Sequence, residues 1–404
     1  MKNIRRWILT ALASGLLAAC GGNDDAPGTG SPSGAPTTKG SFSAVVSFGD
    51  SLSDIGAYAP VTSVTGNGLP PFFGGKWTTN TTNLATGANT AGVWVENIAA
   101  TLSTTAKPIY ITPAEVGFAG QSVACPAAAN PALAGTCTGY GQGGSRVTNP
   151  AGIGNDIGAL TVPMKKQIAN HLARFGSFKD TDLIVVFGGN NDVFVQFGTF
   201  AATAAAIQAD AVAGRISADE ANRRLLDAQL AAQGELKIAA TELAGYVKNE
   251  ILAKGGKYVA VWNLPDSVNT PFGSTLPADI RPVLTGLVDI FNLWLREGLT
   301  NLPVQLVDAN TAFKEAYANP TKYGFVNNTV PACDAEKIKL ITAGAITDGS
   351  SLFCNATPGA PFNGLRDGAD ITTWQFADGV HPTVGGQKVI SDTALLLLKS
   401  YGWI

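Results

Sequence analysis

Short runs of apolar residues, each of a length that suits one buried strand, recur along the chain. They cover residues 43–48, 182–187, 257–262 and 304–307. A run without polar alternation is typical of a strand that is covered on both faces of its sheet. The sequence therefore predicts four central strands that lie between layers of helix.

Helical periodicity fills much of the sequence between these runs. Ser217 and Glu220 form a capping-box pattern, which predicts the start of a long helix. Apolar residues then recur at helical spacing (Leu236, Ala240, Leu243, Val247, Ile251) until Gly255 and Gly256 end the pattern. A second apolar stripe runs through residues 280–295, and residues 383–400 predict a final helix. Alternation of strands and helices predicts an α/β fold with a mostly parallel central sheet.

Ligands of such sheets bind beyond the carboxyl ends of the strands. Ser51 follows the first predicted strand and Asn191 follows the second, so we expect both at that edge. Three longer polar stretches, 59–92, 112–150 and 310–377, do not have the pattern of a core. We expect them to form long insertions around the same rim.

The first forty residues have a different pattern. Lys2, Arg5 and Arg6 precede an apolar stretch, residues 7–19, that is too short to span a bilayer. Residues 17–21 (Leu-Ala-Ala-Cys-Gly) resemble a bacterial lipobox, which implies cleavage before Cys20 and lipidation of its sulfur. The alternative is an ordinary secretory signal with a chance cysteine.

These features divide the chain into three parts. We expect a lipoprotein signal peptide at 1–19, a lipidated Cys20 with a flexible Gly/Pro/Ser-rich linker at 20–41, and one domain at 42–404. The expected location is the cell envelope, as an outer-membrane lipoprotein that contacts the membrane through its lipid. Net charge is −3 with 14% charged residues and no basic patch, so no nucleic-acid partner is expected. The sequence carries no indication of oligomeric state.

Four further cysteines, Cys125, Cys137, Cys333 and Cys354, suit two disulfides in an oxidising compartment. Three pairings are possible. The sequence-local one joins Cys125 to Cys137 and Cys333 to Cys354, and each bridge would contribute about 3 kcal/mol on the chain-entropy model. The first would end seven residues before Gly144 and could restrain it.

The cysteines do not suggest a metal site. The chain has no Cys-x-x-Cys pair, and His171 has no neighbour at ligand spacing. His171 is therefore interpreted as a residue on a helix surface, and no metal is expected.

The residue types of an acyl-transfer site occur in two distant motifs. Ser51 lies in Gly49-Asp50-Ser51-Leu52, and Asp378 and His381 lie three residues apart near the other end of the chain. A serine nucleophile needs a base, and the base needs a carboxylate that orients it. The backbone N–H groups of Ser51 and Gly144 and the side-chain amide of Asn191 would stabilise the oxyanion.

Four blocks together resemble those of the GDSL family, also called the SGNH hydrolases. They are Gly49-Asp50-Ser51-Leu52, Gly143-Gly144-Ser145, Gly189-Asn190-Asn191-Asp192 and Asp378-Gly379-Val380-His381-Pro382. The resemblance implies a flavodoxin-like three-layer α/β/α sandwich and a Ser-His-Asp triad that needs neither metal nor organic cofactor. Ile55-Gly56-Ala57 and Ser145 depart from the commoner Thr-Gly-Asn and Ala, which bears on substrate preference.

The leading hypothesis is a serine ester hydrolase that acts on short- to medium-chain or lipid acyl esters through a covalent acyl-enzyme. One alternative is a polysaccharide O-acetyl esterase with Trp77, Trp94 and Trp374 as a sugar platform. An acyltransferase and a non-catalytic surface-binding lipoprotein on the same scaffold are the others. Further acidic residues are expected to hold loops by accepting backbone N–H bonds (Asp50, Asp54 and Asp192).

Overall fold

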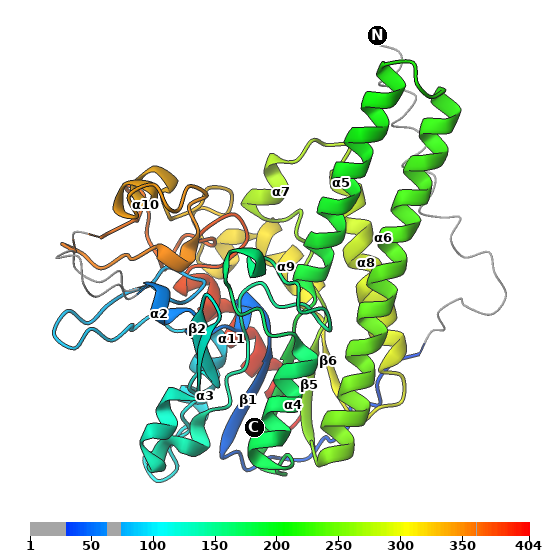
Figure 1. Cartoon of the computed structure of the whole chain (residues 1–404). Coiled ribbons are helices and arrows are strands. Elements are labelled where there is room, and N and C mark those ends of the chain that lie inside the picture. The colour runs from blue at the N-terminus through cyan, green and yellow to red at the C-terminus, as the bar shows by residue number, and fades with distance from the viewer. Residues whose placement is uncertain (1–29, 63–73, 361) are drawn as a thin grey trace.

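The computed structural model describes residues 30–62, 74–360 and 362–404 (Figure 1). Cys20, the predicted signal peptide and the first part of the predicted linker lie outside these residues. Signal cleavage and lipidation therefore stay predictions.

Four parallel strands form the central sheet. They are β1 (Ala44–Gly49), β4 (Asp182–Phe187), β5 (Tyr258–Trp262) and β6 (Gln305–Val307), in the order β1-β4-β5-β6. All three neighbouring pairs are parallel. The four predicted strands are confirmed, each within one residue at either end. The polar stretches add a small antiparallel hairpin of β2 (Glu115–Phe118) and β3 (Gln121–Ala124).

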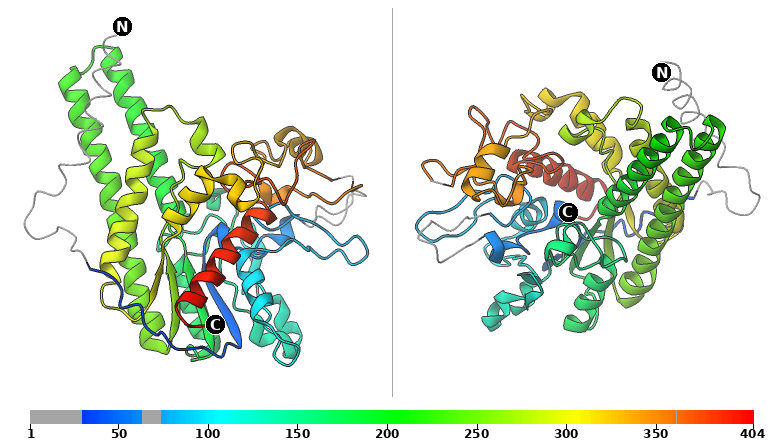
Figure 2. Two further views of the ribbon diagram at one scale, coloured as in Figure 1. Left: turned by 180° about the vertical axis from the view of Figure 1, so that it is seen from behind. Right: turned by 45° about the horizontal axis from the view of Figure 1, so that its top comes forward.

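Side chains that alternate along each strand enter two separate cores. Val46, Ile184 and Val259 face the layer of α4 (Met164–Phe175), α5 (Asn190–Val212), α6 (Ala218–Tyr246) and α8 (Arg281–Gly298). Their neighbours Val45 and Leu183 face α3 (Trp94–Leu102) and α11 (Val384–Ser400), which Figure 2 shows on the opposite face of the sheet. The predicted three-layer α/β fold is confirmed.

The long predicted helix begins where its cap pattern indicates. The Ser217 hydroxyl accepts the backbone N–H of Glu220 at 3.1 Å, and α6 follows. The helix continues through a π-helical turn, Val247–Ile251, and a 3-10 turn, Leu252–Lys254, to Gly255 at φ 98°. With α5 it forms a hairpin that projects beyond the sheet (Figure 1). The cap at Ser217 and the positive φ of Gly255 therefore set the two ends of this helical stretch.

Shorter helices lie mainly in the polar stretches. The α-helices are α2 (Ala59–Thr62), α7 (Pro271–Thr275), α9 (Ala309–Ala318) and α10 (Ala335–Ile341). The remaining 3-10 turns are Ser51–Ser53, Pro126–Ala129, Pro131–Thr136, Asn155–Ile157, Pro320–Tyr323 and Ser351–Phe353. No helix in the described ranges combines the length and apolarity that a membrane crossing requires.

The stretch 112–150 is not wholly a rim insertion. The Thr138 hydroxyl donates to the Val45 carbonyl near the start of β1, and the Tyr140 N–H donates to the Ser47 carbonyl further along. The chain therefore runs beside β1 from its amino end towards its carboxyl end. Cys137 lies near the amino end, so the expectation that this whole stretch decorates the catalytic rim is wrong.

Residues 30–41 are an ordered strap. The Ser33 N–H donates to the Leu302 carbonyl, the Gly40 N–H donates to the Trp403 carbonyl, and the Trp403 indole donates to the Pro36 carbonyl. This part of the predicted flexible linker packs on the domain. On the strap, most of the groups that form these hydrogen bonds belong to the backbone, and a composition rich in Gly, Pro and Ser does not reveal such contacts.

Both sequence-local disulfides are present. Cys125 is bonded to Cys137, and Cys333 is bonded to Cys354, with Cα–Cα distances of 5.6 and 5.9 Å. The first bridge lies near the amino end of β1. It therefore does not hold Gly144 directly, in contrast to the expectation from sequence spacing.

Candidate active site

Ser51 is the first residue of the turn that follows β1. Asp50 caps this turn, since its carboxylate accepts the Leu52 N–H at 3.1 Å. The other carboxylate oxygen accepts the Asn190 side-chain amide at 2.9 Å. The strand end and this clamp fix the Ser51 side chain at the carboxyl edge of the sheet, in the position that the sequence predicts.

His381 and Asp378 reach Ser51 from the segment that precedes α11. The distance from His381 Nε2 to Ser51 Oγ is 2.8 Å. His381 Nδ1 lies 2.9 and 2.8 Å from the two carboxylate oxygens of Asp378. In the tautomer with its proton on Nδ1, His381 donates to Asp378 and leaves Nε2 free to accept the serine proton. The structure thus brings together three residues that the sequence predicted from two distant motifs.

Asp378 is buried but remains ionised. Burial alone would raise its pKa, but the charge of His381 and several hydrogen bonds hold the pKa well below its usual range. The carboxylate accepts the N–H groups of Val380, His381 and Ser351 at 3.0, 2.8 and 2.9 Å. A carboxylate with a lowered pKa can hold the imidazole in one orientation.

The second disulfide supports this carboxylate. Cys333 donates its N–H to the carbonyl of Ala377, and Cys354 donates its N–H to the carbonyl of Ser351. Cys333 therefore binds the residue that precedes Asp378, and Cys354 binds the residue whose N–H donates to Asp378. The Cys333–Cys354 bridge, rather than the Cys125–Cys137 bridge, is close to the catalytic candidates.

Three hydrogen-bond donors converge on the same pocket. The backbone N–H groups of Ser51 and Gly144 donate no hydrogen bond within the described chain, and both residues line the pocket. The Asn191 amide donates one hydrogen to the Ser145 carbonyl at 2.9 Å, which leaves its other hydrogen available. Gly144 adopts φ +77°, and a Cβ there would overlap the Ile153 carbonyl oxygen, so glycine is required.

Two buried carboxylates hold the segment that carries Gly144. Asp54 accepts the N–H of Gly143 at 2.9 Å, and burial raises its pKa to about 6. Asp192 accepts the N–H of Val147 and the Nε–H of Arg146, both at 2.9 Å. Burial raises the pKa of Asp192, although the charge of Arg146 opposes the shift. Both aspartates bind backbone N–H groups as the sequence predicted, whereas the Arg146 partner was missed because no local pattern indicates it.

A pocket of about 200 Å³ opens above these groups. Aromatic side chains form much of its wall (Trp77, Phe194, Phe313 and Phe376). The Trp77 ring centroid lies 4.7 Å from that of His381, so it packs against the candidate base. Trp94 is fully buried and packs on Trp262 at 4.8 Å. It therefore cannot belong to a sugar platform at this pocket.

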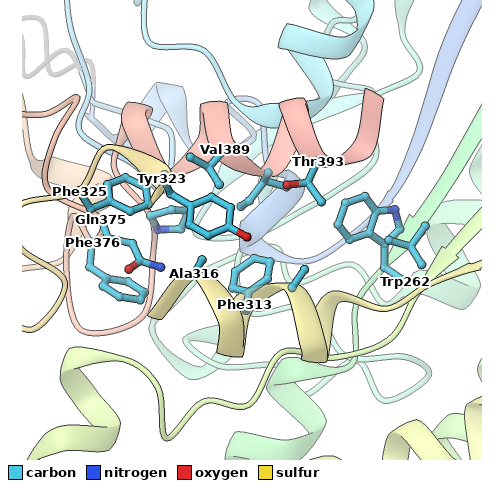
Figure 3. A pocket seen from close by; sticks show the side chains of 14 residues that line it. Trp262, Phe313, Ala316, Tyr323, Phe325, Gln375, Phe376, Val389 and Thr393 are labelled. Carbon is cyan, nitrogen blue, oxygen red and sulfur yellow. The ribbon is translucent and has the colours of Figure 1, made fainter. Parts of the chain in front are cut away.

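A second, smaller cavity lies between α9 and α11. Its volume is about 30 Å³, and its walls are almost entirely apolar (Figure 3). Phe313 and Phe376 line both cavities, and none of the triad candidates lines the smaller one. These two rings therefore form the boundary between the pocket beside Ser51 and the core beneath α11.

His171 is not a surface residue. It is 2% exposed in α4, and its ring stacks on Phe178 with a centroid distance of 4.3 Å. Burial lowers its pKa to about 4, against the opposing effect of a backbone contact with Ser177. No group of three potential ligand residues (His, Cys, Asp or Glu) gathers in the part of the chain that the structure covers.

Comparison with known proteins identifies a family that covers most of the chain. Residues 45–394 match the model of a family described as GDSL-like lipase/acylhydrolase. The chain belongs to this family. Its members are named for the hydrolysis of acyl esters, which supports an ester hydrolase with a small-molecule substrate in general.

Curated relatives match a smaller part of the chain. Esterase EstA of Pseudomonas aeruginosa is 31% identical over 146 residues, which cover 36% of this chain and 20% of the relative. Esterase EstA of Pseudomonas putida gives the same values. A Pseudomonas putida protein described as an uncharacterized protein in the trpE-trpG intergenic region is 30% identical over 150 residues, 36% of this chain and 22% of that protein. The chain thus spans about a fifth of the length of these curated relatives.

Proposed function

We propose that the chain is a serine ester hydrolase that acts on short- to medium-chain or lipid acyl esters. The observation that carries the proposal is the continuous hydrogen-bonded series from Ser51 Oγ to His381 and on to Asp378, with 2.8 Å between Oγ and Nε2. A nucleophile, its base and the orienting carboxylate in this order are the arrangement that acyl transfer requires.

The first half-reaction forms an acyl-enzyme. Ser51 Oγ attacks the ester carbonyl carbon while its proton passes to His381 Nε2. The carbonyl oxygen becomes an oxyanion that the N–H groups of Ser51 and Gly144 and the Asn191 amide stabilise. The C–O bond to the alcohol then breaks, and His381 returns the proton to the departing alkoxide. Alcohol is released and the acyl group remains on Ser51.

The second half-reaction repeats these steps with water. His381 removes a proton from water, the hydroxide attacks the acyl carbon, and the proton returns to Ser51 Oγ as the carboxylic acid leaves. Transfer to a second alcohol instead of water would make the chain an acyltransferase. No step requires a metal or an organic cofactor.

The expected substrate class rests on the aromatic wall of the pocket. Trp77, Phe194, Phe313 and Phe376 suit a hydrocarbon chain better than a polysaccharide. A polysaccharide O-acetyl esterase remains the alternative, with Trp77 as its aromatic contact. An outer-membrane lipoprotein anchored through Cys20 is the proposed setting for either activity.

Hydrolysis of p-nitrophenyl butyrate by wild type, Ser51→Ala and His381→Ala tests the proposal. Each variant should lose activity by several orders of magnitude with an unchanged circular dichroism spectrum. The double variant should be little worse than either single one, because members of a triad act as a unit. Substantial turnover by Ser51→Ala would refute the assignment of the nucleophile. A fluorophosphonate should label wild type at Ser51, as peptide mass spectrometry can establish.

A further inference from the structure

One wall of the catalytic pocket is polar. The segment after β5 supplies it, through Asp266, Ser267, Asn269 and Thr270. Two of these side chains have partners within the protein. Asp266 accepts hydrogen bonds from Val268 N–H and the Thr285 hydroxyl, each at 3.2 Å, and the Thr270 hydroxyl donates to the Ser267 carbonyl at 2.7 Å. Asp266 and Thr270 therefore shape the wall.

Ser267 and Asn269 are different. Neither side chain makes a hydrogen bond in the chain as described, although Ser267 is only 6% exposed and both residues line the pocket. A polar group that is removed from water loses the hydrogen bonds that it made there, so a ligand that fills the pocket is favoured when it supplies new partners. The hydroxyl of Ser267 and the amide of Asn269 are thus free to bind a ligand in the pocket.

The wall is fixed on the side of the pocket where His381 lies. The N–H of Phe272 donates to the Gly379 carbonyl at 2.8 Å, which joins this segment to the loop between Asp378 and His381. The Asn292 side chain also accepts the Leu264 N–H at 2.7 Å. In ester hydrolysis the departing alkoxide must receive its proton from His381. An alcohol half that lies on the His381 side of the pocket would face this wall.

We propose that Ser267 and Asn269 form a subsite for free hydroxyl groups on the alcohol half of the ester. The chain then selects monoesters of polyols, of the glycerol or sugar type, over alkyl esters with the same acyl group. This inference rests on the proposed ester hydrolysis and specifies the substrate class. A site built to pair substrate hydroxyls rejects an analogue without them, because the bound analogue displaces water from the site's polar groups and leaves them unpaired.

The test compares glyceryl 1-monobutyrate with propyl butyrate in a pH-stat. The two esters share the acyl group and a three-carbon alcohol, and they differ only in two hydroxyls. Wild type should show the larger kcat/KM for the glyceryl ester. Asn269→Leu and Ser267→Ala should each lower that value by about 3–10-fold, the worth of one neutral hydrogen bond. The value for propyl butyrate should not fall.

Controls separate the subsite from the fold and from the chemistry. Thr275→Ala changes an exposed residue of the adjoining α7 and should leave both esters unaffected. A glucose 6-butyrate arm decides between glycerol-type and sugar-type alcohols. Equal wild-type rates for the glyceryl and propyl esters, or variants that slow both esters equally, would overturn the subsite. If neither ester is hydrolysed in a Ser51-dependent manner, the proposed function itself is overturned.

Discussion

Replacement of His171 by Phe should make the protein resist mild acid. The imidazole is packed among Phe48, Tyr140 and Phe178, and burial lowers its pKa from 6.5 to about 4. As pH falls below 6.5, the unfolded chain binds a proton at this histidine and the folded chain does not. Stability is therefore lost between pH 6.5 and pH 4. From these two pKa values, the loss between pH 7.5 and pH 5 is about 2 kcal/mol.

Phenylalanine fills similar space, stacks on Phe178 and cannot bind a proton. Urea unfolding followed by tryptophan fluorescence at pH 7.5 and pH 5 gives the free energy of unfolding of each protein. Between pH 7.5 and pH 5, the free energy of unfolding of the variant should fall by about 2 kcal/mol less than that of wild type. The comparison cancels Asp54, whose pKa is raised to about 6 and whose effect has the opposite sign. Equal losses in wild type and variant would refute the reasoning. Phe178→Leu disturbs the same packing but keeps the titrating His171. It should therefore retain the wild-type pH dependence.

Four further predictions concern the active site. Asn191→Ala should lower kcat on p-nitrophenyl butyrate about 10²–10³-fold with a smaller change in KM, because this donor acts mainly in the transition state. Arg146→Leu leaves the Asp192 carboxylate buried without its cation, so chemical unfolding should report a loss of about 3–5 kcal/mol; a stability equal to wild type would contradict this. Cys354→Ser should lower kcat more than Cys137→Ser does, since only the former bridge flanks the catalytic carboxylate; the reverse order in steady-state kinetics would count against that view. Dialysis against EDTA should leave the rate unchanged, and recovery of a lost rate by a divalent cation would contradict a metal-free mechanism.

The sequence predicted the sheet and its long helices because those elements are buried in a periodic way. Residues 182–187 are buried along their whole length, and a strand covered on both faces admits few polar residues. The triad candidates were also predictable, since the chain has two histidines and one of them lies three residues after an aspartate. Short motifs therefore located the chemistry without the fold.

Other features depend on contacts that no local pattern encodes. His171 lies on a helix, but its burial comes from Phe48 of β1 and from Phe178 beyond the helix end. The strap at residues 30–41 is held largely through its own backbone groups, which every sequence possesses. The pairing of Arg146 with Asp192 joins residues that are 46 positions apart. Sequence periodicity reports which face of an element is buried, not which partner covers it.

The division of the triad between the two ends of the chain determines when activity can appear. Ser51 and His381 are separated by 330 positions, and His381 directly precedes the helix whose Ile390 and Leu398 complete the second core. A chain synthesised only as far as α10 would contain the serine and all three oxyanion donors but no base. On the proposed mechanism, newly made protein therefore has no hydrolytic activity until its last helix has docked. The appearance of hydrolysis is then a direct readout of completed folding.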